Sequence, residues 1–237
     1  MAHRGLHADV AENSSSAFRL ALDAGADAIE LDVHATRDGH VVVHHDFAVR
    51  RHRAVDTRRI SDIDYNELRS FALSDGSPIP TLAEVLHETP STVDLYIEVK
   101  PPGIERLVVD CILGSVFPVE RCAIHSFDHR ISRNSRKLCS FINTGLLVVG
   151  YPLDATAMLR GADARDFWLQ WEFVDAEIVE EIHAAHGRVV AWTCNDSAGW
   201  DRLVSFGVDA LCTDKVDELV AWRSSLSANR ADQSLTT

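Results

Sequence analysis

Short and nearly continuous apolar runs recur along this chain, and segments with helical spacing separate them. Such runs are typical of parallel strands that helices cover on the outside. Eight of them are found, at residues 2–4, 28–33, 95–99, 122–125, 145–149, 167–171, 189–193 and 210–213. Helical patterns occupy residues 14–24, 176–185 and 197–206, and a capping box at Thr81-Leu-Ala-Glu84 begins another helix. Eight strand–helix units predict an α/β fold, a (β/α)8 TIM barrel.

The segment after the second strand departs from this alternation. Asp38-Gly39 stands between two β-rich runs and predicts a hairpin turn. In a hairpin centred there, the numbers of paired positions sum to about 77, which places Asp32 opposite His45. A register shifted by one residue would select His44 instead. The hairpin therefore predicts that His45 returns to the level of Asp32.

The chain is predicted to form one catalytic barrel domain at residues 1–223. Residues 47–80 form a small insertion after the second strand, with a short helix near residues 64–71, and this insertion is too small for a core of its own. Residues 224–237 are polar and Ser-rich, and we expect them to form a frayed, disordered tail.

Two carboxylates share one face of the second predicted strand. Glu30 and Asp32 are two positions apart, so both side chains point to the same side of an otherwise apolar run. Buried there, the two carboxylates would repel each other and lose their solvation. A hard divalent cation removes both costs, and oxygen ligands suit Mg²⁺ or Ca²⁺.

The third predicted strand repeats this geometry with Glu98 and Lys100. A lone carboxylate in a strand is more often exposed to solvent or ion-paired than a metal ligand. Two charged pairs on neighbouring strands, at the carboxyl end where barrel active sites lie, favour a functional site. Glu98 is then a candidate third ligand of the cation, and Lys100 a candidate point charge for a phosphate group.

Three further residues end predicted strands. His3 titrates near neutral pH, and the Arg4 guanidinium matches the geometry of phosphate oxygens. Gly5 follows them and allows close approach of a ligand to the backbone. Trp192 either packs against an apolar part of a substrate or belongs to the core.

Composition excludes several classes of protein. The formal net charge of −13 argues against a nucleic-acid partner and against an anionic membrane surface. The five cysteines have no CxxC spacing, and the first residues carry no apolar signal sequence, so we expect a cytoplasmic protein with reduced thiols. No apolar run is long enough to cross a bilayer, and we expect no stable membrane association. The sequence also lacks a G-x-S-x-G elbow, a Walker loop and a G-x-G-x-x-G fingerprint.

These motifs together resemble the glycerophosphodiester phosphodiesterase family. The matching elements, collinear over residues 2–214, are Ala2-His-Arg-Gly5, Glu12-Asn13, Glu30-Leu-Asp32-Val33, Thr36-x-Asp38-Gly39, Val43-x-His45-Asp46, Pro80-Thr-Leu82, Ile97-Glu98-Val-Lys100, Ser126-Phe127-Asp128, Trp192-Thr-x-Asn195, Gly207-Val-Asp209 and Thr213-Asp214. Each element alone is weak, whereas the ordered set is specific.

The resemblance implies hydrolysis of glycerophosphodiesters, small-molecule substrates, to glycerol 3-phosphate and an alcohol. It implies that Glu30, Asp32 and Glu98 hold one divalent cation, Mg²⁺ or Ca²⁺. It also implies that His3 and His45 serve as an acid–base pair. Arg4 and Lys100 match positions that contact the phosphate.

Two other functions remain open at this stage. A lysophospholipase D or sphingomyelinase D-like phosphodiesterase would need an apolar surface beside the site, and the sequence contains no amphipathic membrane-binding stretch. A non-catalytic binding protein on a barrel scaffold would have lost a catalytic residue, whereas His3, His45 and the three carboxylates are all present. The preferred alcohol, the identity of the cation, the nucleophile and the oligomeric state stay undetermined.

Overall fold

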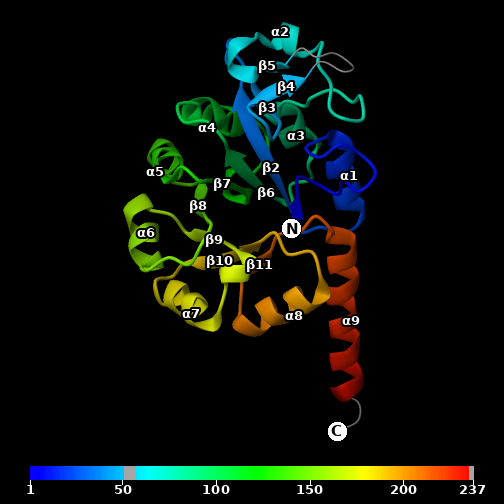
Figure 1. Cartoon of the computed structure of the whole chain (residues 1–237), viewed down its shortest axis with the longest axis vertical. Helices are drawn as coiled ribbons and strands as arrows, with labels where there is room; N and C mark the ends of the chain where they lie inside the picture. Colours follow the sequence, from blue (N-terminus) through cyan, green and yellow to red (C-terminus); the bar gives the residue numbers. More distant parts are fainter. Residues whose placement is uncertain (51–56, 235–237) are drawn as a thin grey trace.

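In the part of the chain that the structure describes, residues 1–50 and 57–234, eight parallel strands form the wall of a barrel in this computed structural model (Figure 1). In order around the wall they are β1 Ala2–His3, β2 Ala28–Ala35, β6 Asp94–Val99, β7 Cys122–Ser126, β8 Asn143–Val148, β9 Asp166–Gln170, β10 Arg188–Trp192 and β11 Ala210–Leu211. The two edges of the sheet meet where Ala2 pairs with Thr213. The predicted TIM barrel and its eight strands are therefore confirmed.

Alternate side chains of each strand face opposite sides of the barrel wall. On β2, Ile29, Leu31 and Val33 are fully buried in the layer between the sheet and the outer helices. The apolar part of the barrel interior contains Met1, Ala28, Tyr96, Ala123, Leu147, Trp168, Val190 and Cys212. Because Glu30 and Asp32 alternate with the outward-facing residues, they face the interior at the carboxyl end of β2.

An outer layer of helices follows the strands. These helices are α1 Ser15–Asp23, α3 Leu82–Glu88, α4 Glu105–Leu113, α5 His129–Leu138, α6 Ala155–Ala162, α7 Ala176–Ala184, α8 Ser197–Phe206 and α9 Val216–Ser234, with short 3₁₀ turns η2 Val119–Arg121 and η3 Trp171–Phe173. The helices predicted at residues 14–24, 176–185 and 197–206 are confirmed as α1, α7 and α8. The capping box is also confirmed, because the Glu84 amide donates to the Thr81 hydroxyl and the Thr81 amide donates to the Glu84 carboxylate.

The insertion after β2 packs on the barrel. It follows β3 Val41–Val43, comprises β4 Ala48–Arg50, β5 Thr57–Arg59, η1 Ile60–Asp62 and α2 Tyr65–Leu68, and lies at the top of Figure 1. Its apolar residues, among them Val49, Ile60 and Phe71, join one buried cluster with Ala11 and Val42. The insertion thus shares a core with the barrel. Residues 51–56 of the predicted insertion lie outside the described residues.

The predicted register of the hairpin is wrong by one residue. Strands β2 and β3 pair Val33 with Val43 and Ala35 with Val41, so the numbers of paired positions sum to 76. Asp32 therefore opposes His44, whose amide donates to the Asp32 carbonyl oxygen. The physical reason is the turn: the Thr36 amide donates to the His40 carbonyl oxygen, which leaves three residues in the loop instead of two.

The long helix α9 covers the lower flank of the barrel and projects beyond it (Figure 1). It differs from the frayed tail expected from residue 224, because the backbone is helical to Ser234; residues 235–237 lie outside the described residues. Leu219 and Trp222 anchor the helix by packing against the apolar layer around α7 and α8. Among the helices in the described ranges, none is long and apolar enough to span a membrane.

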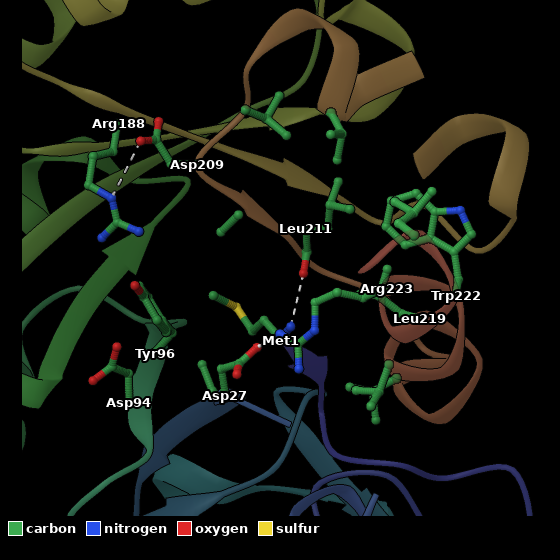
Figure 2. A pocket seen from close by; sticks show the side chains of 17 residues that line it. Met1, Asp27, Asp94, Tyr96, Arg188, Asp209, Leu211, Leu219, Trp222 and Arg223 are labelled. Atoms are coloured by element: carbon green, nitrogen blue, oxygen red, sulfur yellow. Dashed lines mark hydrogen bonds and ion pairs between the residues drawn. The ribbon is translucent and has the colours of Figure 1, made fainter. Parts of the chain in front are cut away.

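A cavity of about 420 Å³ lies at the amino-terminal end of the barrel, between the strands and α9 (Figure 2). Its lining includes Met1, Tyr96, Arg188 and Trp222. The amino group of Met1 donates to the Leu211 carbonyl oxygen there. This lining contains none of the predicted site residues, which gather at the opposite end of the strands.

Candidate active site

A cavity of about 210 Å³ opens at the carboxyl ends of the strands, where β1, β2 and β6 bring the predicted charges together. Its lining residues are His3, Arg4, Glu30, His45, Glu98, Lys100, His125, Phe127, Leu147, Trp168, Trp192 and Cys212. Seven of the eight predicted site residues therefore line one cavity, together with side chains of the barrel interior such as Trp168. Asp32 lies behind the lining, in contact with Arg4 and Lys100. We refer to this space as the catalytic pocket.

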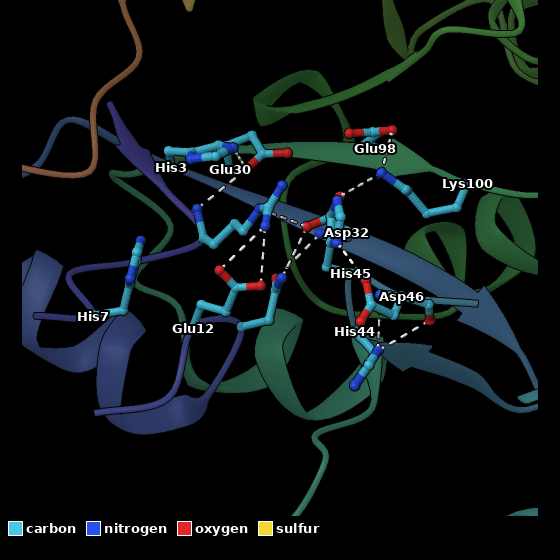
Figure 3. Close-up of polar contacts among 12 residues, drawn as sticks. His3, His7, Glu12, Glu30, Asp32, His44, His45, Asp46, Glu98 and Lys100 are labelled. Carbon is cyan, nitrogen blue, oxygen red and sulfur yellow. Dashed lines mark hydrogen bonds and ion pairs between the residues drawn. The ribbon is translucent and has the colours of Figure 1, made fainter. Parts of the chain in front are cut away.

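The three carboxylates are deeply buried, with 2 % of Glu30, 0 % of Asp32 and 7 % of Glu98 exposed. Lys100 bridges two of them, because its Nζ lies 2.8 Å from Glu98 Oε1 and 3.2 Å from Asp32 Oδ1 (Figure 3). Parallel pairing of Asp32 with Glu98 sets both at one level of the barrel. The two charged pairs therefore form one network across β2 and β6.

Arg4 adds a second cation on the other side of Asp32. Its guanidinium contacts Asp32 Oδ2 at 3.2 Å and Glu12 Oε1 at 3.0 Å, and its backbone amide donates to Glu30. Arg4 and Gly5 both have positive φ, at 54° and 84°, so the chain turns sharply directly after β1. This turn directs the Arg4 guanidinium back over the end of β2.

The surroundings shift the pKa values of Asp32 and Glu98 in opposite directions. Burial raises the pKa of Glu98, and the neighbouring Asp32 charge raises it further, against the opposing effect of Lys100. Burial also acts to raise the pKa of Asp32, but Lys100 and Arg4 outweigh it and hold this pKa below its ordinary value. A cation bound at Glu98 would favour its ionised form.

Glu30, Glu98 and His125 offer ligand atoms that all lie within 4.8 Å of one another, and all three side chains are buried. Two carboxylates and an imidazole fit a divalent cation. The structure thus brings Glu30 and Glu98 together as expected. Asp32 is not part of this group and is held by Lys100, Arg4 and Asn13.

His3 is fixed by a carboxylate from the other end of the chain. Its Nδ1 lies 2.7 Å from Asp214 Oδ1, while its Nε2 lies 4.0 Å from Glu30. Asp214 is itself held by Asn195 at 2.7 Å and contacts His7 at 3.4 Å. Burial acts to lower the pKa of His3, but Asp214 and Glu30 outweigh it and raise this pKa. Asp214 therefore fixes the ring with Nε2 on the side of the carboxylates.

His45 lines the catalytic pocket although the hairpin register differs from the prediction. Strand β3 ends at Val43, so strict alternation between the two faces ends before His44 and His45. The Nδ1 atom of His45 lies 2.8 Å from Asp46 Oδ1 (Figure 3). His44 instead accepts from the Asp46 amide at 3.0 Å. The selection of His45 agrees with its position, for a different reason from the one expected.

Three residues that the sequence analysis did not assign to the site contact its members. Asp214 holds His3, and His125 Nε2 lies 3.5 Å from Glu30 Oε1. Asn13 donates to the Asp32 carboxylate at 2.9 Å and accepts from the Asp32 amide. His125 occupies an inward-facing strand position directly opposite Glu98 in the β6–β7 pairing, and this alternation was the signal that could have found it.

Two aromatic side chains contribute apolar surface to the lining of the pocket. Trp192 is half-buried, and the Phe127 ring packs edge-on against it with a centroid separation of 5.5 Å. Both aromatic rings line the catalytic pocket. Trp192 also packs against the apolar interior of the barrel, so both alternatives stay open: contact with an apolar part of a substrate and a place in the core.

The Asp214→Asn substitution tests whether this carboxylate orients His3. We expect kcat to fall by about 100-fold or more, because the imidazole loses its fixed tautomer and the partner of its charged form. Steady-state kinetics on the substrate that the sequence resemblance implies measure this, with the exposed Asp201→Asn variant as the control. Unchanged kcat in the Asp214 variant would show that His3 does not depend on this contact.

A model of the "Glycerophosphoryl diester phosphodiesterase family" matches residues 3–218. The chain is 30 % identical to a glycerophosphodiester phosphodiesterase of Caldanaerobacter subterraneus subsp. tengcongensis, over 93 % of this chain and 95 % of that protein. It is 31 % identical to one of Bacillus altitudinis, over 95 % and 98 %. An Oleispira antarctica phosphodiesterase, solved with the product sn-glycerol-3-phosphate, superposes with a TM-score of 0.85 at 25 % identity, over 94 % and 95 % of the two chains. The chain belongs to the glycerophosphoryl diester phosphodiesterase family.

Proposed function

We propose that this enzyme hydrolyses glycerophosphodiesters to glycerol 3-phosphate and an alcohol, with a divalent cation held by Glu30 and Glu98. The third ligand is Asp32, as the sequence resemblance implies, or His125, whose ring lies beside both carboxylates. The observation that carries the proposal is the convergence of buried carboxylates, the positively charged side chains of Arg4 and Lys100, and the imidazoles of His3 and His45 around one pocket. Similarity to a phosphodiesterase that was solved with sn-glycerol-3-phosphate supports the choice of glycerol as the constant half of the substrate.

When bound, the cation would act as a Lewis acid on a phosphoryl oxygen and stabilise charge in the transition state. Arg4 and Lys100 bind phosphoryl oxygens with their own positive charges. Both are already aligned by carboxylates, since Glu12 holds Arg4 and Glu98 holds Lys100. The loss of either positively charged side chain would weaken binding of the phosphodiester.

The two histidines carry the proton transfers. Each has its Nδ1 against a carboxylate, Asp214 for His3 and Asp46 for His45, so each has Nε2 available for the substrate. We assign His3 as the base that takes a proton from the attacking oxygen, of water or of a substrate hydroxyl, and His45 as the acid that protonates the leaving alcohol. Trp192 contacts the apolar face of the glycerol.

Hydrolysis of glycerophosphocholine with and without EDTA tests the reaction and the need for a cation. We expect EDTA to lower kcat/KM by at least about 100-fold and added Mg²⁺, Ca²⁺ or Mn²⁺ to restore it. His45→Asn should lower kcat by about 10²–10⁴-fold with the cation present. His87→Asn, an exposed histidine on α3, is the matched control. Full activity in EDTA would show that the reaction needs no bound cation. Full activity of His45→Asn would show that His45 is not the acid.

A further inference from the structure

A second group of side chains that can ligate a metal ion lies beside the catalytic pocket, where the loop after β1 meets the end of β11. His3, His7 and Asp214 offer ligand atoms that all lie within 4.8 Å of one another. The other such group among the described residues is the one around Glu30. His7 has no part in the proposed reaction, and it lies on the side of the site away from Lys100 (Figure 3). We call this group the two-histidine cluster.

The backbone of two loops holds the cluster together. The His3 amide donates to the Thr213 carbonyl oxygen at 2.9 Å where the barrel closes, which sets Asp214 beside His3. The loop that carries His7 is anchored to α1 by a backbone hydrogen bond to the Ala17 carbonyl oxygen. The three side chains therefore start from positions that the fold fixes, so little ordering is needed to bind a ligand.

One oxygen of the Asp214 carboxylate faces both imidazoles. Asp214 Oδ1 lies 2.7 Å from His3 Nδ1 and 3.4 Å from His7 Nε2. The other oxygen, Oδ2, accepts from the Asn195 side-chain amide at 2.7 Å, an outer contact of the kind that orients metal ligands. Neighbouring ligand atoms of a tetrahedral zinc ion lie about 3.4 Å apart. Small shifts of these side chains would therefore let all three hold one ion.

The donor set selects the class of cation. Two imidazole nitrogens and one carboxylate oxygen suit Zn²⁺, whereas Mg²⁺ and Ca²⁺ prefer oxygen ligands. The side chains of His3, His7 and Asp214 are 20 %, 23 % and 34 % exposed, so an ion can reach them from solvent and keep a water molecule as fourth ligand. The cluster thus differs in chemistry from a site built mainly of carboxylates.

We propose that His3, His7 and Asp214 form a second metal site, which binds Zn²⁺ and thereby switches off the catalytic pocket. The binding of Zn²⁺ is independent of the proposed function, whereas the switch rests on the role of His3 as the base. A neutral imidazole carries its proton on one of its two nitrogens. With Zn²⁺ on Nδ1, this proton resides on Nε2, which can then no longer accept one from the attacking oxygen.

Direct binding of Zn²⁺ tests the site without turnover. Isothermal titration in saturating Mg²⁺ should reveal a Zn²⁺ site that Mg²⁺ does not displace. We expect His7→Gln to weaken this binding by at least about tenfold, because loss of even an outer partner of a metal ligand costs that much. Glu30→Gln, which weakens the catalytic cation site, should keep the wild-type affinity for Zn²⁺. His87→Gln, an exposed histidine of α3, is the matched control.

Steady-state kinetics on glycerophosphocholine test the switch. In saturating Mg²⁺, Zn²⁺ should lower kcat and leave KM unchanged, because Arg4 and Lys100 stay free to bind the phosphate. His7→Gln should keep the wild-type kcat in the absence of Zn²⁺, since His3 retains Asp214. Half-inhibition of this variant should need at least about tenfold more Zn²⁺, in proportion to the weaker binding.

Distinct results would overturn each part of the inference. Wild-type protein that binds no Zn²⁺ in saturating Mg²⁺ would show that the cluster is held by hydrogen bonds alone. Equal Zn²⁺ affinity in His7→Gln, or inhibition that additional Mg²⁺ relieves, would place Zn²⁺ at the catalytic cation site instead. Binding that depends on His7 without inhibition would overturn the switch. Absence of hydrolysis in Mg²⁺ alone would overturn the proposed function, while the titration would still decide whether the second site exists.

Discussion

Glu30→Gln should lower kcat/KM by about 1000-fold or more, since loss of a cation that stabilises the transition state by several kcal/mol corresponds to that factor. Glu30 is 2 % exposed and lies within 4.0 Å of both His3 and His125. The substitution keeps the shape of the side chain and removes one negative charge, so we expect the cation to bind at least about 100-fold more weakly. Isothermal titration with Mg²⁺ or Mn²⁺ measures this affinity directly.

The fold should survive the same substitution. The Glu30 charge is one of the causes that raise the pKa of buried Glu98, so its removal relieves repulsion between the two carboxylates. The melting temperature in EDTA should therefore stay within a few degrees of the wild-type value. Glu120→Gln, an exposed residue of η2, is the control. Wild-type activity or wild-type cation affinity in Glu30→Gln would remove this residue from the metal site.

Lys100→Met should abolish turnover because it removes a positive charge from the site, whereas Glu30→Gln removes a negative one. The side chain of Lys100 is 11 % exposed and holds both Asp32 and Glu98, so its loss leaves two buried carboxylates without that cation. We expect a cost of about 3 kcal/mol in the free energy of unfolding in EDTA, at the low end of the range for breaking a buried pair because Glu98 takes up a proton readily. For a chain of this size this corresponds to a melting temperature roughly 6–12 °C lower.

The affinity for the cation distinguishes the two variants. Lys100 repels a cation at Glu98, so Lys100→Met should bind Mg²⁺ about tenfold more tightly while losing the contact to the phosphate. Saturating Mg²⁺ should then recover about 3 kcal/mol of stability at 100 times the dissociation constant. Lys137→Met, an exposed lysine of α5, controls for loss of a positive charge. Weaker cation binding in Lys100→Met would show that Lys100 supports the metal site instead of competing with it.

Alternation along a single strand predicted the orientation of the acidic side chains correctly. Glu30 and Asp32 lie two positions apart within an apolar run, and the structure places both side chains inside the barrel, as alternation requires. The same reasoning holds for Glu98 and Lys100, whose level relative to β2 follows from parallel pairing. The roles of these residues as ligands and phosphate contacts stay predictions.

Positions whose geometry depends on a loop were predicted less well. The hairpin register depended on whether the turn between Thr36 and His40 contains two or three residues, and Asp38-Gly39 fits both. Asn13 resembles a helix N-cap, yet Ser14 caps α1, and Asn13 has a φ of 56° and binds Asp32. Side chains at such positions have partners that local pattern does not specify.

By itself the sequence determined the barrel, its eight strands and the inward-facing carboxylates, because alternation and helical spacing are local consequences of backbone geometry. The tertiary structure alone decided which distant groups meet. Closure of the barrel between Ala2 and Thr213 sets Asp214 against His3, across 211 positions of the chain. The tertiary structure also decided that Phe47 of the insertion and Phe127 after β7 line one cavity with Lys100, since their separation in sequence carries no information on this proximity.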